Sequence, residues 1–108
     1  YSLKLVINNS IEVDSKTNFS IEIVEKADES KYIDDEYVND VNVSSSNKLV
    51  YFDENKNKTS FEYNQSSVKS LDIWTNIYSG IEFVDVNASI YNGEKNITIS
   101  QRFKVVII

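Results

Sequence analysis

Apolar and polar residues alternate along most of the chain with a period of two. The clearest runs, in which every second residue is apolar, are Leu3–Ile7, Phe19–Ile23, Val84–Ile90 and Ile97–Ile99. Successive side chains of a β-strand point to opposite faces of its sheet, so this period is typical of strands with one buried face and one face in water. The alternation therefore predicts antiparallel sheets.

Turn-forming residues separate the alternating runs. They occur at Val13–Ser15, Asp53–Lys58, Ser79–Gly80 and Asn92–Gly93. An Asn-Gly pair readily takes the positive φ angles of a tight hairpin turn, so we expect Asp85–Tyr91 to pair with Asn96–Phe103. The acidic stretch Ala27–Asp40 lacks alternation, and two alternatives remain for it: a long crossing loop, or a short helical turn with Ile33 and Tyr37 one turn apart.

The apolar residue types favour strands over helices. Val and Ile together number 25, Tyr 7 and Phe 5, whereas Leu and Ala together number 6. β-Branched and aromatic side chains suit the pleated surface of a sheet. A chain of 108 residues has the length of one domain. We therefore predict a single domain over residues 1–108, an all-β, immunoglobulin-like antiparallel β-sandwich of seven to nine strands.

The charge balance excludes two classes of partner. The chain has 17 acidic and 11 basic residues, a formal net charge of −6, and no stripe of basic residues. Nucleic acids and anionic membranes bind proteins through clustered positive charge, so neither is an expected partner. No apolar run reaches the length that crosses a membrane, so we expect no membrane insertion of this segment. We interpret the chain as a soluble piece of a longer or processed protein.

Residues that carry catalysis or bind metals are scarce. Cys and His are absent, which removes the thiolate nucleophile, the imidazole base and the usual zinc ligands. Acidic residues are frequent, but no pattern indicates two carboxylates held across a cleft. Asp53, Asn55 and Asn57 begin like a calcium loop, yet Lys58 occupies the position of the required Gly. The Asp34–Asp40 stretch is a looser alternative. We predict no enzyme, no metal and no cofactor.

Asparagine carries the sharpest signal. Seven of the 13 asparagines begin an Asn-x-Ser/Thr triplet, the acceptor motif for N-linked glycans: Asn8, Asn18, Asn42, Asn57, Asn64, Asn87 and Asn96. Ser and Thr make up 19 of 108 residues, so random placement would give about two such triplets. The motifs predict N-glycosylation and an extracellular or cell-surface location. The alternative is that a compositional bias toward Asn and Ser on solvent-exposed surfaces produces these motifs without any glycosylation.

Several aromatic residues fall on the polar phase of their predicted strands. Trp74 and Tyr78 share one phase of the expected strand Leu71–Tyr78, opposite to Leu71, Ile73 and Ile77, and Phe83 and Tyr91 occupy the polar phase of theirs. Exposed, rigid aromatic rings suit stacking on a sugar or contact with a protein. The alternative is that Trp74 is a buried core tryptophan, as is common in sandwich domains.

The last residues of the chain break the alternation. From Val105 onward both phases are apolar, so that Val106 and Ile108 either face water or are covered. An uncovered apolar strand at a sheet edge is a template for pairing with another chain. This predicts that Phe103, Val106 and Ile108 lie near an interface. The alternatives are a centrally buried strand, or a strand that continues into a further domain.

Two stretches resemble parts of known modules. The final hairpin of immunoglobulin-like surface modules resembles Val86–Gly93 followed by Ile97–Ile108. The first two strands of these modules are similar to Leu3–Ile7, Ile11–Val13 and Phe19–Ile23. Such modules occur in archaeal surface-layer and appendage proteins, including archaellum stator subunits, and in adhesins. The resemblance implies a structural or adhesive role and assigns no functional residue.

Two functional hypotheses follow. The first is a non-catalytic extracellular module that contacts other surface proteins, or copies of itself, through sheet edges or faces. The second is a carbohydrate-binding module that holds a glycan on Trp74 and Tyr78.

Overall fold

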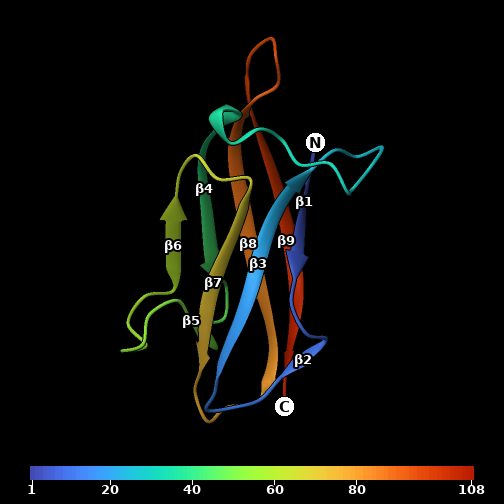
Figure 1. The fold of residues 1–108 in the computed structure, drawn as a ribbon. Helices are drawn as coiled ribbons and strands as arrows, with labels where there is room; N and C mark the ends of the chain where they lie inside the picture. The colour runs from blue at the N-terminus through green and yellow to red at the C-terminus, as the bar shows by residue number, and fades with distance from the viewer.

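β-Strands occupy most of the chain. The computed structural model describes residues 1–108 and contains nine strands and one 3-10 helix (Figure 1): β1 (Ser2–Val6), β2 (Ser10–Ile11), β3 (Lys16–Val24), η1 (Asp35–Tyr37), β4 (Val38–Ser45), β5 (Val50–Tyr51), β6 (Ser60–Tyr63), β7 (Val68–Thr75), β8 (Gly80–Tyr91) and β9 (Asn96–Ile107). No helix is long and apolar enough to span a membrane.

The strands form two sheets that pack face to face. The four-stranded sheet has the order β1-β3-β7-β5, and the five-stranded sheet has the order β2-β9-β8-β4-β6. In immunoglobulin-like sandwiches strands A, B and E share one sheet and strands C, F and G share the other. Here β1, β3 and β7 share one sheet and β4, β8 and β9 share the other, which confirms the predicted all-β, immunoglobulin-like sandwich.

The N-terminal segment contributes to both sheets. β1 pairs antiparallel with β3, from Ser2↔Val24 to Val6↔Ser20. The chain then crosses to the other sheet, where β2 pairs parallel with the end of β9, at Ser10↔Val106 and Ile11↔Ile107. The end of β9, at Val106 and Ile107, is therefore covered by β2 and is not the uncovered strand edge that we predicted from the sequence.

The β8–β9 hairpin confirms the pairing predicted from Asn92-Gly93. Its register runs from Gly80↔Ile107 to Tyr91↔Asn96. The connection has four residues, because the last register pair is Tyr91↔Asn96, and the Asn92 N–H donates to the Lys95 carbonyl oxygen across it at 3.1 Å. Gly93 has φ of 99°, a conformation that side-chain-bearing residues rarely adopt. The glycine is therefore required by the turn, although the turn is longer than the two-residue one that Asn-Gly favours.

The core lies between the two sheets and is filled by the apolar phase of the strands. Its buried residues are mostly Val and Ile, and they include Phe19, Ile21, Ile23, Val41, Val43, Ile73, Val84, Val86 and Ile90. Complete burial of a side chain of this size stabilises the fold by about 1.5–3 kcal/mol relative to leaving it in water. The period-two pattern thus predicts the buried positions of Phe19–Ile23 in β3 and of Val84–Ile90 in β8, whereas the buried face of β4 and the buried Glu22 and Glu82 lie outside the prediction.

Strand β7 ends earlier than its sequence pattern predicts. We expected a strand over Leu71–Tyr78, but β7 stops at Thr75, and Ile77 is 71% exposed although it shares the phase of Ile73. The Thr75 hydroxyl donates to the Glu12 carbonyl oxygen at 2.7 Å and accepts the Ser15 N–H at 3.0 Å. These bonds hold the end of β7 against the β2–β3 turn, so the chain leaves the sheet there.

The acidic stretch Ala27–Asp40 combines the two alternatives drawn from its sequence. It is a long connection that contains η1 and then enters β4. Ile33 is buried, whereas Tyr37 is exposed, so the two side chains do not share one environment. The Asp35 carboxylate accepts the N–H and the hydroxyl of Ser67, both at 2.8 Å, and thereby attaches η1 to the segment before β7. These bonds lower the pKa of Asp35.

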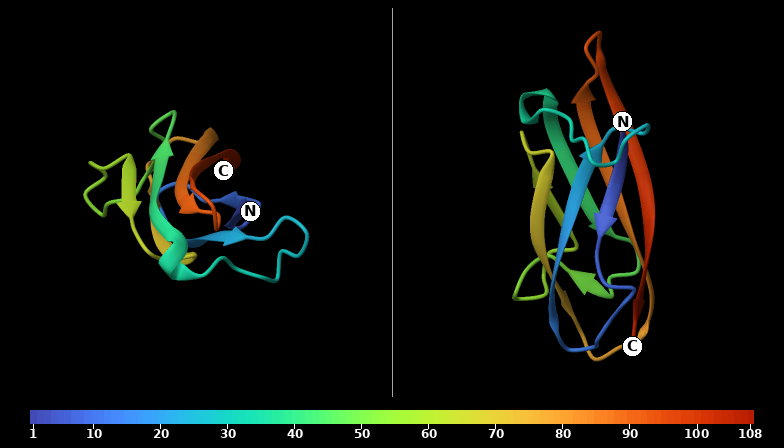
Figure 2. Two further views of the ribbon diagram at one scale, coloured as in Figure 1. Left: turned by 90° about the horizontal axis from the view of Figure 1, so that it is seen from above. Right: turned by 45° about the vertical axis from the view of Figure 1, so that its right-hand side comes forward.

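The two ends of the chain lie at opposite ends of an elongated molecule. Its extents are 46 × 25 × 18 Å. The N- and C-termini lie toward opposite ends of the long axis in Figure 1 and in the right-hand view of Figure 2, and the β8–β9 hairpin turn extends beyond the N-terminus. The β7–β8 connection lies at the same end as the C-terminus (Figure 1). We call this end the C-terminal pole.

Candidate functional site

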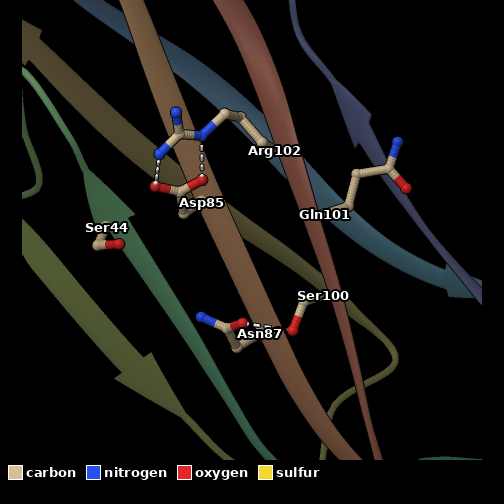
Figure 3. A pocket seen from close by; sticks show the side chains of 6 residues that line it. All are labelled: Ser44, Asp85, Asn87, Ser100, Gln101 and Arg102. Atoms are coloured by element: carbon tan, nitrogen blue, oxygen red, sulfur yellow. Dashed lines mark hydrogen bonds and ion pairs between the residues drawn. The ribbon is translucent and has the colours of Figure 1, made fainter.

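The outer face of the five-stranded sheet carries a continuous set of polar side chains. Five of these side chains point away from the core, because residues next to each of them in the same strand face it. They are Ser44 of β4, Asp85 and Asn87 of β8, and Ser100 and Arg102 of β9. With Gln101 they line a shallow hollow of about 410 Å³ (Figure 3). We call this surface the polar face.

An ion pair lies at the centre of the polar face. Asp85 and Arg102 are opposite each other in the β8–β9 register. The guanidinium group donates from Nε to Oδ1 at 2.8 Å and from Nη2 to Oδ2 at 3.1 Å (Figure 3). The hydrogen bonds that Arg102 donates to Asp85, and then the negative charge of Asp85, raise the pKa of Arg102. The guanidinium also lies 5.2 Å from the ring centre of Phe83, so both its charge and its flat face are already engaged.

Amide and hydroxyl groups complete the polar face. The Ser100 hydroxyl donates to Oδ1 of Asn87, which leaves the Asn87 amide nitrogen pointing away from β9 (Figure 3). Asn42 of β4 stands directly opposite Asn87 and is half-buried. The chain has no group of three or more acidic side chains that could hold a metal ion. This face offers hydrogen-bond donors and acceptors, and the Asp85 carboxylate on it is held in an ion pair.

The seven Asn-x-Ser/Thr motifs are distributed over both sheets and their loops. Six of the seven asparagines are exposed, and Asn42 is half-buried. The amide nitrogen of Asn18 donates to the Leu71 carbonyl oxygen at 3.2 Å and to Oδ1 of Asp72 at 3.3 Å, so a glycan there, which replaces one amide hydrogen, would break one of these hydrogen bonds. In Asn96 the oxygen Oδ1 accepts the Asn39 amide at 3.1 Å, and the amide nitrogen is left available.

The predicted aromatic platform of Trp74 and Tyr78 is not formed. Trp74 points outward from the four-stranded sheet and is half-buried, so it is not a core residue. Tyr78 lies beyond the end of β7, in the connection at the C-terminal pole. The neighbours of Trp74 in the sheet are Lys16 of β3 and Tyr51 of β5.

The other predicted aromatic residues lie in separate places. Phe83 is half-buried on the polar face beneath Arg102. Tyr91 is exposed near the hairpin turn, with its ring centre 6.0 Å from that of Tyr37. Phe103 stands opposite Val84 and packs against the core. These three rings do not form one surface.

Four of the nine exposed large apolar side chains, including the three most exposed, lie at the C-terminal pole. Ile77 is 71% exposed, Tyr78 63%, Ile108 62% and Ile81 48%. Ile81 begins β8 and is opposite Val106, which is half-buried. Ile108 is held beside the β2–β3 turn, because its carbonyl oxygen accepts the Val13 N–H at 2.9 Å. We call Ile77, Tyr78, Ile81 and Ile108 the apolar pole.

Glu82 is a buried carboxylate that the sequence analysis missed. It has no exposed surface, and five donors converge on it at 2.7–3.1 Å: the hydroxyls of Ser45 and Ser46 and the backbone N–H groups of Asn47, Leu49 and Phe83. Burial alone raises the pKa of a carboxyl group, but here the hydrogen bonds outweigh it and the pKa of Glu82 lies below its ordinary value. The signal was present in the sequence, since Glu82 occupies the apolar phase of Val84 and Val86.

Comparison with known proteins supports the fold but identifies no family. No protein-family model matches the chain, and no curated protein matches it. Among solved structures, the chain is similar to part of a β-glucuronidase from glycoside hydrolase family 2, with a TM-score of 0.50 and 13% sequence identity. The alignment covers 99% of this chain and 12% of that chain. At this identity the likeness concerns the β-sandwich fold alone.

Proposed function

We propose that the chain is a non-catalytic, immunoglobulin-like module of an N-glycosylated cell-surface protein, and that it makes protein–protein contacts through the apolar pole. The observation that carries the proposal is the gathering of Ile77, Tyr78, Ile81 and Ile108 at one end of the molecule. Loop tips and strand ends are usually polar, and clustered apolar groups at such a place are typical of an interaction surface.

The positions of the Asn-x-Ser/Thr motifs support this assignment. None of the seven begins within the β7–β8 connection or within the last residues of β9. Asn8 lies close to the apolar pole, two residues before Ser10, which pairs with Val106. Glycans on the other exposed asparagines would cover sheet faces and other loops and would leave the apolar pole accessible. The partner is a neighbouring copy of the chain or another protein of the same surface, because an apolar patch is recognised by a complementary apolar surface.

The absence of His and Cys, together with the shallow shape of the polar face, supports a non-catalytic role. Its Asp85 carboxylate is paired with Arg102 at 2.8 Å and is therefore already engaged within the face. The remaining groups of the face are amides and hydroxyls, which bind and orient but do not transfer protons readily at that pH.

Charge substitution at the pole tests the proposal. In the double variant Ile81→Lys/Ile108→Lys we expect weaker self-association in sedimentation velocity, with an unchanged melting temperature because both side chains are largely exposed. Ser60→Lys, on the exposed outer side of β6, is the matched control and should associate like the wild type. A photo-crosslinking residue at Tyr78 in the full-length surface protein should capture a neighbouring protein, and the same residue at Ser60 should not. Equal behaviour at the two positions would refute the proposal.

A further inference from the structure

A second hollow lies on the outer face of the four-stranded sheet, toward the end of β7. It has a volume of about 200 Å³ and is lined by Asp14, Ser15, Lys16, Lys56, Trp74 and Thr75. The residues come from the β2–β3 turn, the start of β3, the end of β7 and the loop after β5. It belongs neither to the polar face nor to the apolar pole, and we call it the Trp74 hollow.

One aromatic ring, that of Trp74, lines the hollow, and Tyr51 stands next to it in the sheet outside the hollow. Trp74 is directly opposite Lys16 on one side and Tyr51 on the other, so the three side chains form one row on the outward face. Both rings are half-buried, which fixes them by packing and leaves part of their surface in contact with water. Rigid aromatic faces of this kind bind the flat apolar side of a sugar ring at little cost in conformational entropy.

The rim of the hollow carries more positive than negative charge. Lys56 lies 3.5 Å from Asp14, and these two charges offset each other. Lys16 is exposed and has no carboxylate within 4.0 Å, so its ammonium group is available to a ligand. In a chain of net charge −6 this is an unusual local arrangement, and it favours an anionic group next to the Trp74 ring.

The walls of the hollow are already ordered by internal hydrogen bonds. The Ser15 N–H donates to the Thr75 hydroxyl, and the Ser15 hydroxyl donates to the Glu12 carbonyl oxygen at 2.7 Å. The Lys56 N–H donates to the Asp53 carbonyl oxygen at 2.8 Å, which closes the turn that carries Lys56. A site that is ordered before binding loses less entropy when the ligand arrives.

We propose that the Trp74 hollow binds an acidic saccharide, with a pyranose ring stacked on Trp74 and its carboxylate paired with Lys16. A neutral sugar would use the ring and leave Lys16 unpaired, whereas a simple anion would use Lys16 and leave the ring uncovered. The polar face does not offer the same combination, because Arg102 is neutralised by Asp85 and covers Phe83. The proposal goes beyond the proposed function, since it concerns another surface and another class of ligand.

The test uses the single tryptophan of the chain as a reporter. Titration with a trimer of galacturonate should change the Trp74 fluorescence in a saturable manner, and the neutral trimer of galactose should bind several-fold more weakly. Lys16→Gln should weaken binding of the acidic trimer about fivefold, as expected for one exposed charge pair, and leave binding of the neutral trimer unchanged. Trp74→Ala, followed by calorimetry, should weaken both by a factor on the order of ten.

Controls separate this site from the apolar pole and from charge alone. Lys104→Gln, an exposed lysine on the other sheet, should not change the titration, and neither should Ile81→Lys. Sodium sulfate alone should not change the fluorescence. The proposal is overturned if the acidic and neutral trimers bind equally, if Lys16→Gln affects both alike, if sulfate reproduces the signal, or if neither trimer binds. None of these outcomes bears on the protein contacts of the apolar pole.

Discussion

Replacement of Glu82 by Gln tests how much a single buried carboxylate contributes to this sandwich. The substitution keeps the shape of the side chain, removes its charge and turns one of its two acceptor oxygens into a donor. Oε2 accepts the Ser45 hydroxyl at 2.8 Å and the Leu49 N–H at 2.7 Å, while Oε1 accepts the other three donors. With the new amide at the Oε2 position, the Ser45 hydroxyl can rotate to accept, but the Leu49 N–H cannot.

The magnitude follows from these contacts. An unsatisfied buried N–H costs about 1–3 kcal/mol, and a hydrogen bond to a charged group contributes about 1 kcal/mol more than one to a neutral group. Removal of the charge also relieves its desolvation, which offsets part of the loss. We expect Glu82→Gln to lower the free energy of unfolding by about 3 kcal/mol, equivalent to a melting temperature lower by roughly 10–20 °C for a domain of this size.

The assay is urea unfolding at pH 7 and at successively lower pH, with Glu62→Gln on the exposed side of β6 as the control. Because the folded pKa of Glu82 lies below its ordinary value of 4.5, its contribution is present above the unfolded pKa and is lost as pH falls through the folded pKa. The difference between wild type and Glu82→Gln should therefore shrink below about pH 4.5. A loss under 1 kcal/mol at pH 7, or a difference that does not change with pH, would refute this reasoning.

Three further predictions concern other parts of the molecule. The buried hydroxyl of Tyr63 has no hydrogen-bond partner and burial raises its pKa, so Tyr63→Phe should leave the melting temperature unchanged or raise it, and a fall of several degrees would show that the hydroxyl is bonded. Asn42 is half-buried and faces Asn87, so in a eukaryotic secretory host Asn87→Gln should remove one glycan by intact mass while Asn42→Gln removes none. Calcium or a chelator should not shift the melting temperature, whereas a rise of several degrees with calcium would reveal a site in the Asp34–Asp40 stretch.

The sequence predicts the parts of the fold that depend on local alternation. Val84, Val86 and Ile90 are buried because they occupy one phase of a strand with a core on one side, and the same phase reasoning places Trp74 outward. Asn92-Gly93 identifies the hairpin because Gly93 adopts a φ angle that suits glycine.

The parts that depend on contacts between distant residues were not predicted. β7 ends at Thr75 because its hydroxyl bonds to residues some 60 positions earlier, and no local pattern reports that contact. For the same reason the sequence paired Trp74 with Tyr78, whereas its neighbours in the sheet are Lys16 and Tyr51. Pairing across the sheet, rather than spacing along the chain, determines which side chains form a binding surface.

The placement of the two termini at opposite ends of the long axis has a mechanical consequence. Tension between the termini pulls β1 along its own direction past β3, to which it is paired through five consecutive residue pairs. Antiparallel hydrogen bonds are perpendicular to the strands, so such a load shears them together instead of opening them one after another. At the other end the load on β9 is shared between β8 and the short parallel pairing with β2. The domain is therefore connected so as to resist stretching along its length.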